Sequence, residues 1–217
     1  MLKGIIFDFD GVIAESVQVK TDAFAELYSS YGADVVDKVI SHHENNGGVS
    51  RFKKIEFYHK SFLNKNINKN ELSTLSNKFS KLVINKIINA PYVPGVFDFI
   101  NNNYKINDMF ISTGTPTSEI KEILKCRKIL HYFRGIYGSP SNKEEHVFDI
   151  SSKYDIKFNK LVFIGDAQTD LEAASKFGVK FILRINEQNK TLFKDYKGSF
   201  INNFNNKAKL NKILNNI

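Results

Sequence analysis

The sequence predicts an α/β protein, in which a Rossmann-like parallel sheet forms the core and an α-helical cap domain is inserted into it. Three observations support this prediction. Short apolar runs rich in β-branched residues recur along the chain, segments with helical spacing alternate with them, and one stretch near the amino terminus has helical patterns alone. Alternation at these lengths favours parallel strands whose two faces are covered by helices.

The expected strands are short. The first is LKGIIF at residues 2–7, and its continuous apolar character fits a strand buried on both faces. Runs of the same kind follow: MFIS at 109–112, LVFIG at 161–165 and KFILR at 180–184. Helical spacing occupies the segments at 118–126, 143–154 and 170–178. The Asn-rich segment from residue 201 is expected to end in one amphipathic helix.

A helical insertion interrupts this alternation. Between residues 15 and 90 the chain has long helical patterns, VQVKTDAFAELYSSYG and NELSTLSNKFSKLVINKIINA, and no convincing strand. Turn-forming residues mark both ends, DG at 10–11 and PYVPG at 91–95. We therefore expect a core domain made of residues 1–14 and 92–217, and an α-helical cap domain of residues 15–91 over one edge of the sheet.

The composition excludes several classes of protein. The single cysteine, Cys126, excludes an internal disulfide framework and a zinc cluster with several thiolate ligands. No apolar run approaches the roughly 18 residues that span a bilayer. Asp8 also comes too early for a cleaved signal sequence. We expect a cytoplasmic protein that is not anchored in a membrane and is a monomer or a weak dimer.

The basic charge has two interpretations. A net charge of +8 and a pI near 9.3 fit a nucleic-acid-binding protein, but the lysines are scattered among Asn and Ile. The only basic cluster with interleaved aromatic residues is RFKKIEFYHK at 51–60, which fits one face of a cap helix. We expect a solvated basic surface that attracts small anions, and we do not expect nucleic acid as a partner.

Two acids end the first expected strand. Asp8 and Asp10 are two residues apart, so their side chains point to the same side, and Gly11 follows them. Ligands of parallel sheets bind beyond the carboxyl ends of the strands. Two bare carboxylates there repel each other and resist burial, which a divalent cation would relieve. The alternative is that DFDG only forms a turn.

A second pair of acids follows a later strand. Asp166 comes directly after the run at 161–165, and Asp170 follows one turn later, where a helix begins. Capping of that helix would explain Asp170, but it would not explain Asp166. The two strand ends together therefore indicate a shared acidic site.

Two further segments add polar groups at the same edge. Ser112, Thr113 and Gly114 end the run at 109–112, and they provide small hydroxyls and a backbone that a ligand can approach closely. Lys143 lies at the start of the helix at 143–154. A lysine in that position is, by itself, typical of a solvated surface.

These four segments resemble, in order and spacing, the motifs of the haloacid dehalogenase-like superfamily of phosphotransferases. The matching stretches are DFDGVIAES, ISTGTP, GSPSNK and GDAQTD, and they extend across nearly the whole chain. The resemblance implies hydrolysis of phosphate monoesters through an aspartyl-phosphate, with Mg²⁺ as cofactor. It also implies that Asp8 is the nucleophile and that Asp10 first protonates the leaving oxygen and then activates water.

The resemblance assigns roles to the other residues. Asp8, the carbonyl of Asp10, and Asp166 would bind Mg²⁺, and Asp170 would orient that shell. Lys143 would offset the charge of the nucleophile and the phosphate. Thr113 would donate to a phosphate oxygen, since Thr-Gly-Thr-Pro aligns with the family's Thr-Asn-Lys-Pro, although Ser112 fits an alternative spacing. Gly114 would let the phosphate approach the backbone, and Gly11 would let the chain leave the first strand tightly.

The helical insertion matches the position of the family's α-helical cap. Within it, GGVSRFKKIEF at 47–57 resembles the Gly-Val-Ser-Arg substrate loop of members similar to β-phosphoglucomutase and phosphoglycolate phosphatase. Arg51 would then contact an anionic or hydroxylated leaving group. The alternative is an arginine that faces water from the first turn of a helix. The preceding His42 and His43 are expected to be surface or packing residues.

The resulting hypothesis is a magnesium-dependent phosphatase for a small phosphorylated metabolite, such as a sugar phosphate or phosphoglycolate. One alternative is a sugar phosphomutase similar to β-phosphoglucomutase. Mutase relatives carry His and Trp where this chain has Lys20 and Phe24, which favours the phosphatase. Another alternative is a catalytically silent or nucleic-acid-binding member, but a silent member would usually have lost one of the acids, and all are present.

Overall fold

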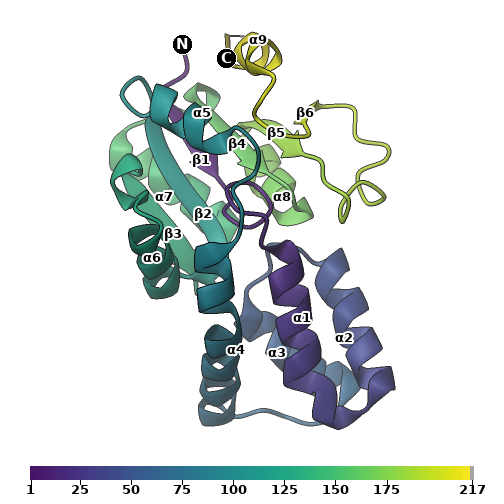
Figure 1. The fold of residues 1–217 in the computed structure, drawn as a ribbon. Helices are drawn as coiled ribbons and strands as arrows, with labels where there is room; N and C mark the ends of the chain where they lie inside the picture. Colours follow the sequence, from purple (N-terminus) through teal and green to yellow (C-terminus); the bar gives the residue numbers. More distant parts are fainter. Residues whose placement is uncertain (216–217) are drawn as a thin grey trace.

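The computed structural model describes residues 1–215 and contains the parallel sheet predicted from the sequence (Figure 1). The strand order is β3-β2-β1-β4-β5-β6, and every neighbouring pair is parallel. The strands are β1 (Gly4–Phe7), β2 (Asp108–Pro116), β3 (Gly135–Ser139), β4 (Leu161–Gly165), β5 (Lys180–Arg184) and β6 (Ser199–Ile201).

The register brings three strand ends to one level. In β1, Phe7 is paired with Ile111 of β2 and with Ile164 of β4. The residues that follow these three positions therefore emerge side by side at the carboxyl edge of the sheet. This is the edge at which parallel sheets bind ligands.

The helices fall into two groups along the chain. Between β1 and β2 lie α1 (Val17–Tyr28), α2 (Ala33–Asn45), α3 (Arg51–Phe62), α4 (Lys69–Asn89) and α5 (Val96–Asn103). The later helices are α6 (Thr117–Cys126), α7 (Lys143–Tyr154), α8 (Gln168–Lys176) and α9 (Lys207–Asn215). Short 3₁₀ turns occupy Ser29–Tyr31, Leu130–Tyr132 and Phe158–Lys160.

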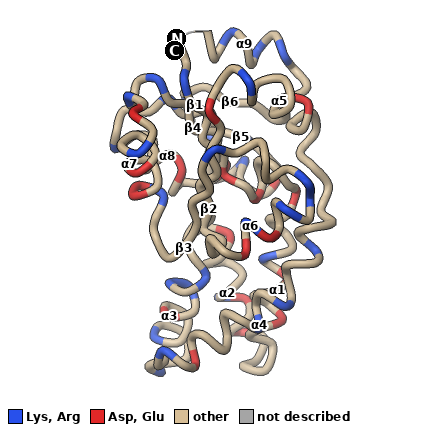
Figure 2. The backbone as a smooth tube through the Cα atoms, turned by 90° about the vertical axis from the view of Figure 1, so that its left-hand side faces the viewer, with Lys and Arg blue, Asp and Glu red and all other residues tan. Residues whose placement is uncertain are grey.

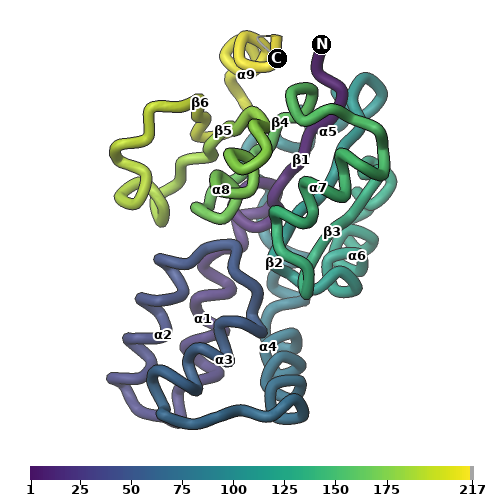
Figure 3. The backbone as a smooth tube through the Cα atoms, turned by 180° about the vertical axis from the view of Figure 1, so that it is seen from behind, coloured from purple at the N-terminus to yellow at the C-terminus, as the bar shows by residue number. Residues whose placement is uncertain are grey.

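Helices cover both faces of the sheet, as Figures 1 and 3 show from opposite sides. Ile5 and Phe7 of β1 belong to one apolar core together with side chains of α5, α6 and α9. Ile6 points the other way and packs with side chains of α7 and α8. The alternation along β1 explains why this strand is apolar throughout: neither of its faces meets water.

Helices α1 to α4 form the cap at the end of the molecule opposite α9 (Figures 1 and 3). Their shared core is built around Phe24, whose ring centroid lies 4.4 Å from that of Phe79 and 5.6 Å from that of Tyr58. The chain enters and leaves this group at one place, where the Glu15 amide donates to the Pro91 carbonyl at 2.9 Å. We propose that the boundary between core and cap lies at this paired crossing.

The sequence analysis missed β3, β6 and α5. The strand β3 reads GIYGS, and its glycines interrupt the apolar run by which the other strands were identified. The strand β6 has only 3 residues, and both missed strands lie at the edges of the sheet. Edge strands need less apolar side-chain area, so periodicity detects them poorly.

The basic residues do not form one face of the molecule. Figure 2 shows Lys and Arg interspersed with Asp and Glu along the chain. Within the basic cluster at 51–60, Arg51 and Lys54 are only 4% and 2% exposed. Part of the segment that the sequence analysis considered as a nucleic-acid surface is therefore buried in the protein.

Among the described helices, none is both long enough and apolar enough to cross a bilayer.

Candidate active site

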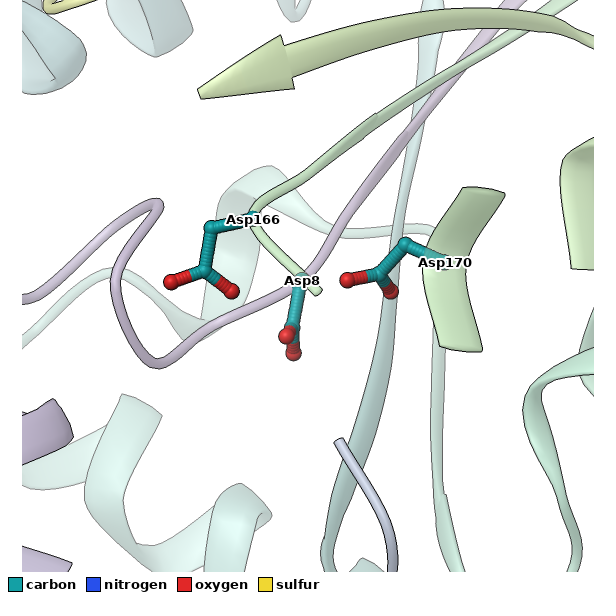
Figure 4. A group of neighbouring side chains, drawn as sticks. All are labelled: Asp8, Asp166 and Asp170. Atoms are coloured by element: carbon teal, nitrogen blue, oxygen red, sulfur yellow. The ribbon is translucent and has the colours of Figure 1, made fainter. Parts of the chain in front are cut away.

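Three carboxylates converge at the carboxyl edge of the sheet. Asp8 follows β1, Asp166 follows β4, and Asp170 lies in the first turn of α8 (Figure 4). One oxygen of each lies within 4.8 Å of the others. Asp170 is fully buried, and Asp8 and Asp166 are 3% and 9% exposed. The sequence analysis grouped these three residues correctly as neighbours in space.

Lys143 is the cation in contact with this cluster. Its Nζ lies 2.8 Å from Oδ2 of Asp8 and 2.5 Å from Oδ1 of Asp170. A capping box formed by Asn142 and Glu145 begins α7 at Lys143, which fixes where the side chain starts. Burial alone would lower the pKa of Lys143, but Asp170 and Asp8 raise it well above its ordinary value, so the ammonium stays charged.

One ammonium does not balance three acids. Burial, then repulsion from Asp8 and Asp170, raises the pKa of Asp166 well above its ordinary value. Burial raises the pKa of Asp170 to about 7, with Asp8 adding to it, although Lys143 acts in the opposite direction. A cluster of buried carboxylates that favours protonation is suited to a divalent cation, and carboxylate oxygens are the ligands that Mg²⁺ prefers.

Asp10 has a cation of its own. Its carboxylate accepts a hydrogen bond from the Ser16 hydroxyl at 2.7 Å and forms an ion pair with Lys20. Lys20 also donates to Oγ1 of Thr115 at 2.9 Å. Burial alone would raise the pKa of Asp10, but the Lys20 ammonium holds it below its ordinary value. Asp10 is therefore a carboxylate, and it lines the same pocket as Asp8.

Gly11 is required by the neighbouring Asp166. It adopts a φ of +74°, and a Cβ at this position would lie 2.0 Å from Oδ2 of Asp166. Any other residue would displace that carboxylate and strain the backbone. We infer that Gly11 supports the acid cluster by leaving room for it.

Ser112 and Thr113, the two residues expected as candidates for a phosphate donor, lie in different surroundings. The Ser112 hydroxyl is bonded to Nδ1 of His146 at 2.9 Å and does not line the pocket between cap and core. Thr113 and Gly114 both line that pocket. Oγ1 of Thr113 accepts from the Thr115 amide at 3.2 Å, which leaves its own proton available for a ligand.

The cap loop, which joins α2 to α3 and contains Gly47 and Gly48, is closed against the core. The Gly47 carbonyl accepts a hydrogen bond from the Thr169 hydroxyl at 3.1 Å. A Cβ on Gly48 would lie 2.9 Å from Nζ of Lys143, and one on Gly114 would lie 2.5 Å from the Gly48 carbonyl. The glycines of this loop thus let the cap backbone lie directly over Lys143.

Arg51 does not face water, and in this structure its guanidinium is bound to the core. Nη1 of Arg51 lies 2.9 Å from Oε2 of Glu119, and Nη2 binds the other carboxylate oxygen. The Ser80 hydroxyl donates to Oε2 of Glu119 at 2.6 Å. Arg51 also lines the pocket, so a substrate contact from this position stays a prediction.

The sequence analysis missed residues that support the acids and residues that line the pocket. Asn186 donates to Oδ2 of Asp166 at 3.1 Å, and Asn189 donates to the Asp166 carbonyl at 2.7 Å. These asparagines lie in the segment between β5 and β6, where no motif marks them. Glu119 could have been found only as an acid in the first turn of the helix after β2.

The pocket lies between cap and core and has a volume of about 900 Å³ when its open mouth is included. Both parts supply its walls, which include Asp8, Asp10, Lys20, Phe24, His43, Lys54, Phe79 and Thr113.

Solved structures share this architecture. The chain superposes on β-phosphoglucomutase from Clostridium difficile with a TM-score of 0.79 and 18% identity, over 100% of this chain and 98% of that one. For a predicted phosphoglycolate phosphatase from Haemophilus somnus the TM-score is 0.71 at 16% identity, with coverage of 96% and 97%. For YfnB from Bacillus subtilis, bound to magnesium, it is 0.69 at 16% identity, with 99% of each chain covered. These similarities establish the fold.

No curated protein matches the sequence. The family model for haloacid dehalogenase-like hydrolases matches residues 5–184, a span that holds every site residue expected from the sequence. The chain therefore belongs to the haloacid dehalogenase-like hydrolase family.

Proposed function

We propose that this protein is a magnesium-dependent phosphatase that hydrolyses a small phosphorylated metabolite through an aspartyl-phosphate. The observation that carries the proposal is the convergence of Asp166, Asp170 and Lys143 on Asp8, with Asp10 facing the same pocket. Membership of a hydrolase family and the similarity to a predicted phosphoglycolate phosphatase support it.

The residues present fit a magnesium ion. Asp8 and Asp166 would hold it with their carboxylates, and Asp10 with its backbone carbonyl. Asp170 would orient these ligands. The raised pKa values of Asp166 and Asp170 are the observation that supports this assignment. When bound, Mg²⁺ supplies positive charge to the phosphoryl oxygens. YfnB, which shares the fold, is bound to magnesium.

Asp8 and Asp10 divide the chemistry between them. A carboxylate oxygen of Asp8 forms a bond to phosphorus while the ester bond breaks, and Asp10 gives a proton to the leaving oxygen. Asp10 then takes a proton from water, whose oxygen bonds to phosphorus as the bond to Asp8 breaks. Inorganic phosphate leaves, and Asp8 returns to its carboxylate form. Because Asp10 is a carboxylate in this structure, the proton that it gives to the leaving oxygen comes from the Lys20 ammonium paired with it, and the proton taken from water returns to Lys20.

Lys143 and Thr113 lower the barrier by stabilising charge. Phosphate monoesters are among the slowest biological esters to hydrolyse, so the site must supply stabilisation near the top of the known range. Lys143 already contacts Asp8 and stays charged, and it offsets the negative charge that builds up when the phosphate arrives. The free proton of Thr113 would donate to a phosphoryl oxygen.

The test is a panel of phosphorylated metabolites assayed for phosphate release with magnesium, using the wild type beside Asp8→Asn. We expect at least one ester to be hydrolysed, and we expect the variant to lose activity by about 10⁴-fold or more. The proposal is wrong if no ester is hydrolysed, or if the variant remains fully active. A hexose 1-phosphate supplied with glucose 1,6-bisphosphate tests for the mutase, which would isomerise the sugar without net phosphate release.

A further inference from the structure

Lys54 is a buried lysine on the cap side of the pocket. It belongs to α3, is only 2% exposed, and lines the pocket together with the catalytic acids. Its Nζ lies 2.7 Å from Nδ1 of His43 and 3.2 Å from the His43 carbonyl. Both contacts come from one residue of α2, so the position of the ammonium is fixed by the cap alone.

His43 acts as a neutral acceptor. It is 7% exposed, and burial, reinforced by Lys54, lowers its pKa to about 2. Its Nδ1 therefore carries a lone pair that accepts from Lys54. An ammonium has three N–H donors, and the described residues provide Lys54 with these two acceptors. One donor is left for a ligand.

Lys54 differs from the other cations of the pocket. Lys20 forms an ion pair with Asp10, and Arg51 forms one with Glu119. Within residues 1–215 no carboxylate forms an ion pair with Lys54. A buried cation without a counter-ion is costly, because the Coulombic gain that would offset its desolvation is missing.

The surroundings of Lys54 make a packing role a poor explanation. Its Nζ lies 5.8 Å from the ring centroid of Phe24, and Phe79 lines the same pocket. A methionine or leucine would pack against these rings without the cost of burying an amine. Burial, then repulsion from Lys20 and Lys143, lowers the pKa of Lys54 well below its ordinary value. An anion that enters the pocket would remove both penalties.

We propose that Lys54, oriented by His43, binds a second oxyanion carried by the leaving group of the substrate. This inference rests on the proposed phosphatase function. The reacting phosphate lies at Asp8 on the core, and the second anion pairs with Lys54 on the cap. The substrate is therefore a phosphate ester whose leaving group carries a carboxylate or a second phosphate. Lys54 is the binding residue, and His43 is a positioning residue.

The arrangement selects substrates by charge. An ester with an uncharged leaving group leaves Lys54 buried and unpaired when the cap closes. An ester with a second oxyanion supplies the missing counter-ion, and a charge-assisted hydrogen bond joins cap and core through the substrate. The preference should appear mainly in KM, because this contact is present before the reaction and throughout it.

Matched pairs of esters test the inference. Phosphoglycolate is compared with 2-hydroxyethyl phosphate, and a sugar bisphosphate with the corresponding monophosphate, so that each pair differs in one anionic group. In at least one pair, the wild type should prefer the ester with the additional anionic group by about 10- to 100-fold in kcat/KM. Preference in the first pair identifies a carboxylate, and preference in the second a phosphate.

Two variants decide whether Lys54 causes the preference. Lys54→Met should abolish it, mainly through KM, and Lys54→Arg should restore part of it. Lys60→Met removes an exposed charge from the same helix and should leave the preference intact. No preference in the wild type, or an unchanged preference in Lys54→Met, would overturn the inference.

A binding measurement separates this inference from the proposed function. The Asp8→Asn variant is not expected to hydrolyse the esters, so its affinity for each can be measured by calorimetry. The same measurement is made on the double variant that also carries Lys54→Met. The second anion site is supported if Lys54→Met weakens the affinity only for the esters that carry a second anionic group. This conclusion holds even if the wild type hydrolyses nothing, in which case only the phosphatase proposal fails. If the wild type hydrolyses an ester but Lys54→Met leaves every affinity of Asp8→Asn unchanged, this inference is overturned and the phosphatase proposal stands.

Discussion

The guanidinium of Arg51, on cap helix α3, is held by both carboxylate oxygens of Glu119, on core helix α6. Arg51 lies 4.6 Å over the ring of Phe79, and both members of the ion pair are almost fully buried. This pair ties the cap to the core beside the pocket, at a residue that the sequence analysis expected to contact the substrate.

We predict that Glu119→Gln destabilises the protein by about 3 to 5 kcal/mol, because it leaves the Arg51 charge buried without its partner. Urea denaturation of the variant and the wild type measures this loss. The control is Asp108→Asn, which breaks the ion pair with Arg134 at the surface, where the two side chains are 33% and 52% exposed. That change should cost less than about 1 kcal/mol. Equal losses in the two variants would contradict the prediction.

Removal of Lys20 should shift the pH dependence of turnover. Lys20 holds the pKa of Asp10 below its ordinary value, so Lys20→Met should raise that pKa. The second half of the reaction needs ionised Asp10, which is lost as the pH falls through its pKa. The acidic limb of the kcat profile should therefore move to higher pH, and Lys20→Arg should keep it near the wild-type position. An unmoved limb in Lys20→Met would show that Asp10 is not the base.

Magnesium should stabilise the folded protein as well as activate it. A ligand that binds only the folded state at about 100 times its Kd adds about 2.7 kcal/mol of stability. We expect magnesium to raise the Tm of the wild type and chelation to abolish hydrolysis. Asp166→Asn should lose most of the rise in Tm, whereas Asp37→Asn, at an exposed position of α2, should keep it. The same rise in both variants would place the ion elsewhere.

His146 should make the protein sensitive to acid. Its Nδ1 is bonded to the Ser112 hydroxyl at 2.9 Å and its Nε2 lies 3.3 Å from the Gly138 carbonyl, so the neutral ring fits this site. Burial lowers its pKa from 6.5 to about 4. The unfolded chain therefore binds this proton first, and stability is lost as the pH falls from about 6.5 to about 4.

The slope of this loss is about 1.4 kcal/mol per pH unit for one group. His146→Gln removes the titrating ring and should flatten that part of the curve, as measured by urea denaturation at a series of pH values. His43 titrates in the same direction, so the difference between the wild type and the variant is the quantity to compare. Parallel curves would show that His146 does not contribute.

The acid cluster could be predicted because it follows from chain geometry. Asp8 and Asp166 stand directly after apolar strands, and parallel strands end at one edge, so their proximity needs no knowledge of the side chains. The start of α7 at Lys143 was equally accessible, because a capping box marks it in the sequence.

The cap side of the pocket could not be predicted in this way. Lys54 and His43 lie in helices with many polar residues, and nothing in the sequence distinguishes these two from the others. Only the packing of α2 against α3 buries them and brings them into contact. Glu119 is similar, since its contact with Arg51 joins residues 68 positions apart. Helical periodicity indicates which face is apolar, but not which charged residue is enclosed when two domains meet.

The paired crossing between core and cap begins at Glu15, five residues from Asp10, and the segment just beyond it supplies both donors to that carboxylate. Ser16 and Lys20 stand where the chain passes into α1. A cap that swings away would carry these donors with it and leave Asp10 without them. Movement of the cap at this crossing would therefore raise the pKa of Asp10, which couples the protonation of the acid–base group to the position of the cap.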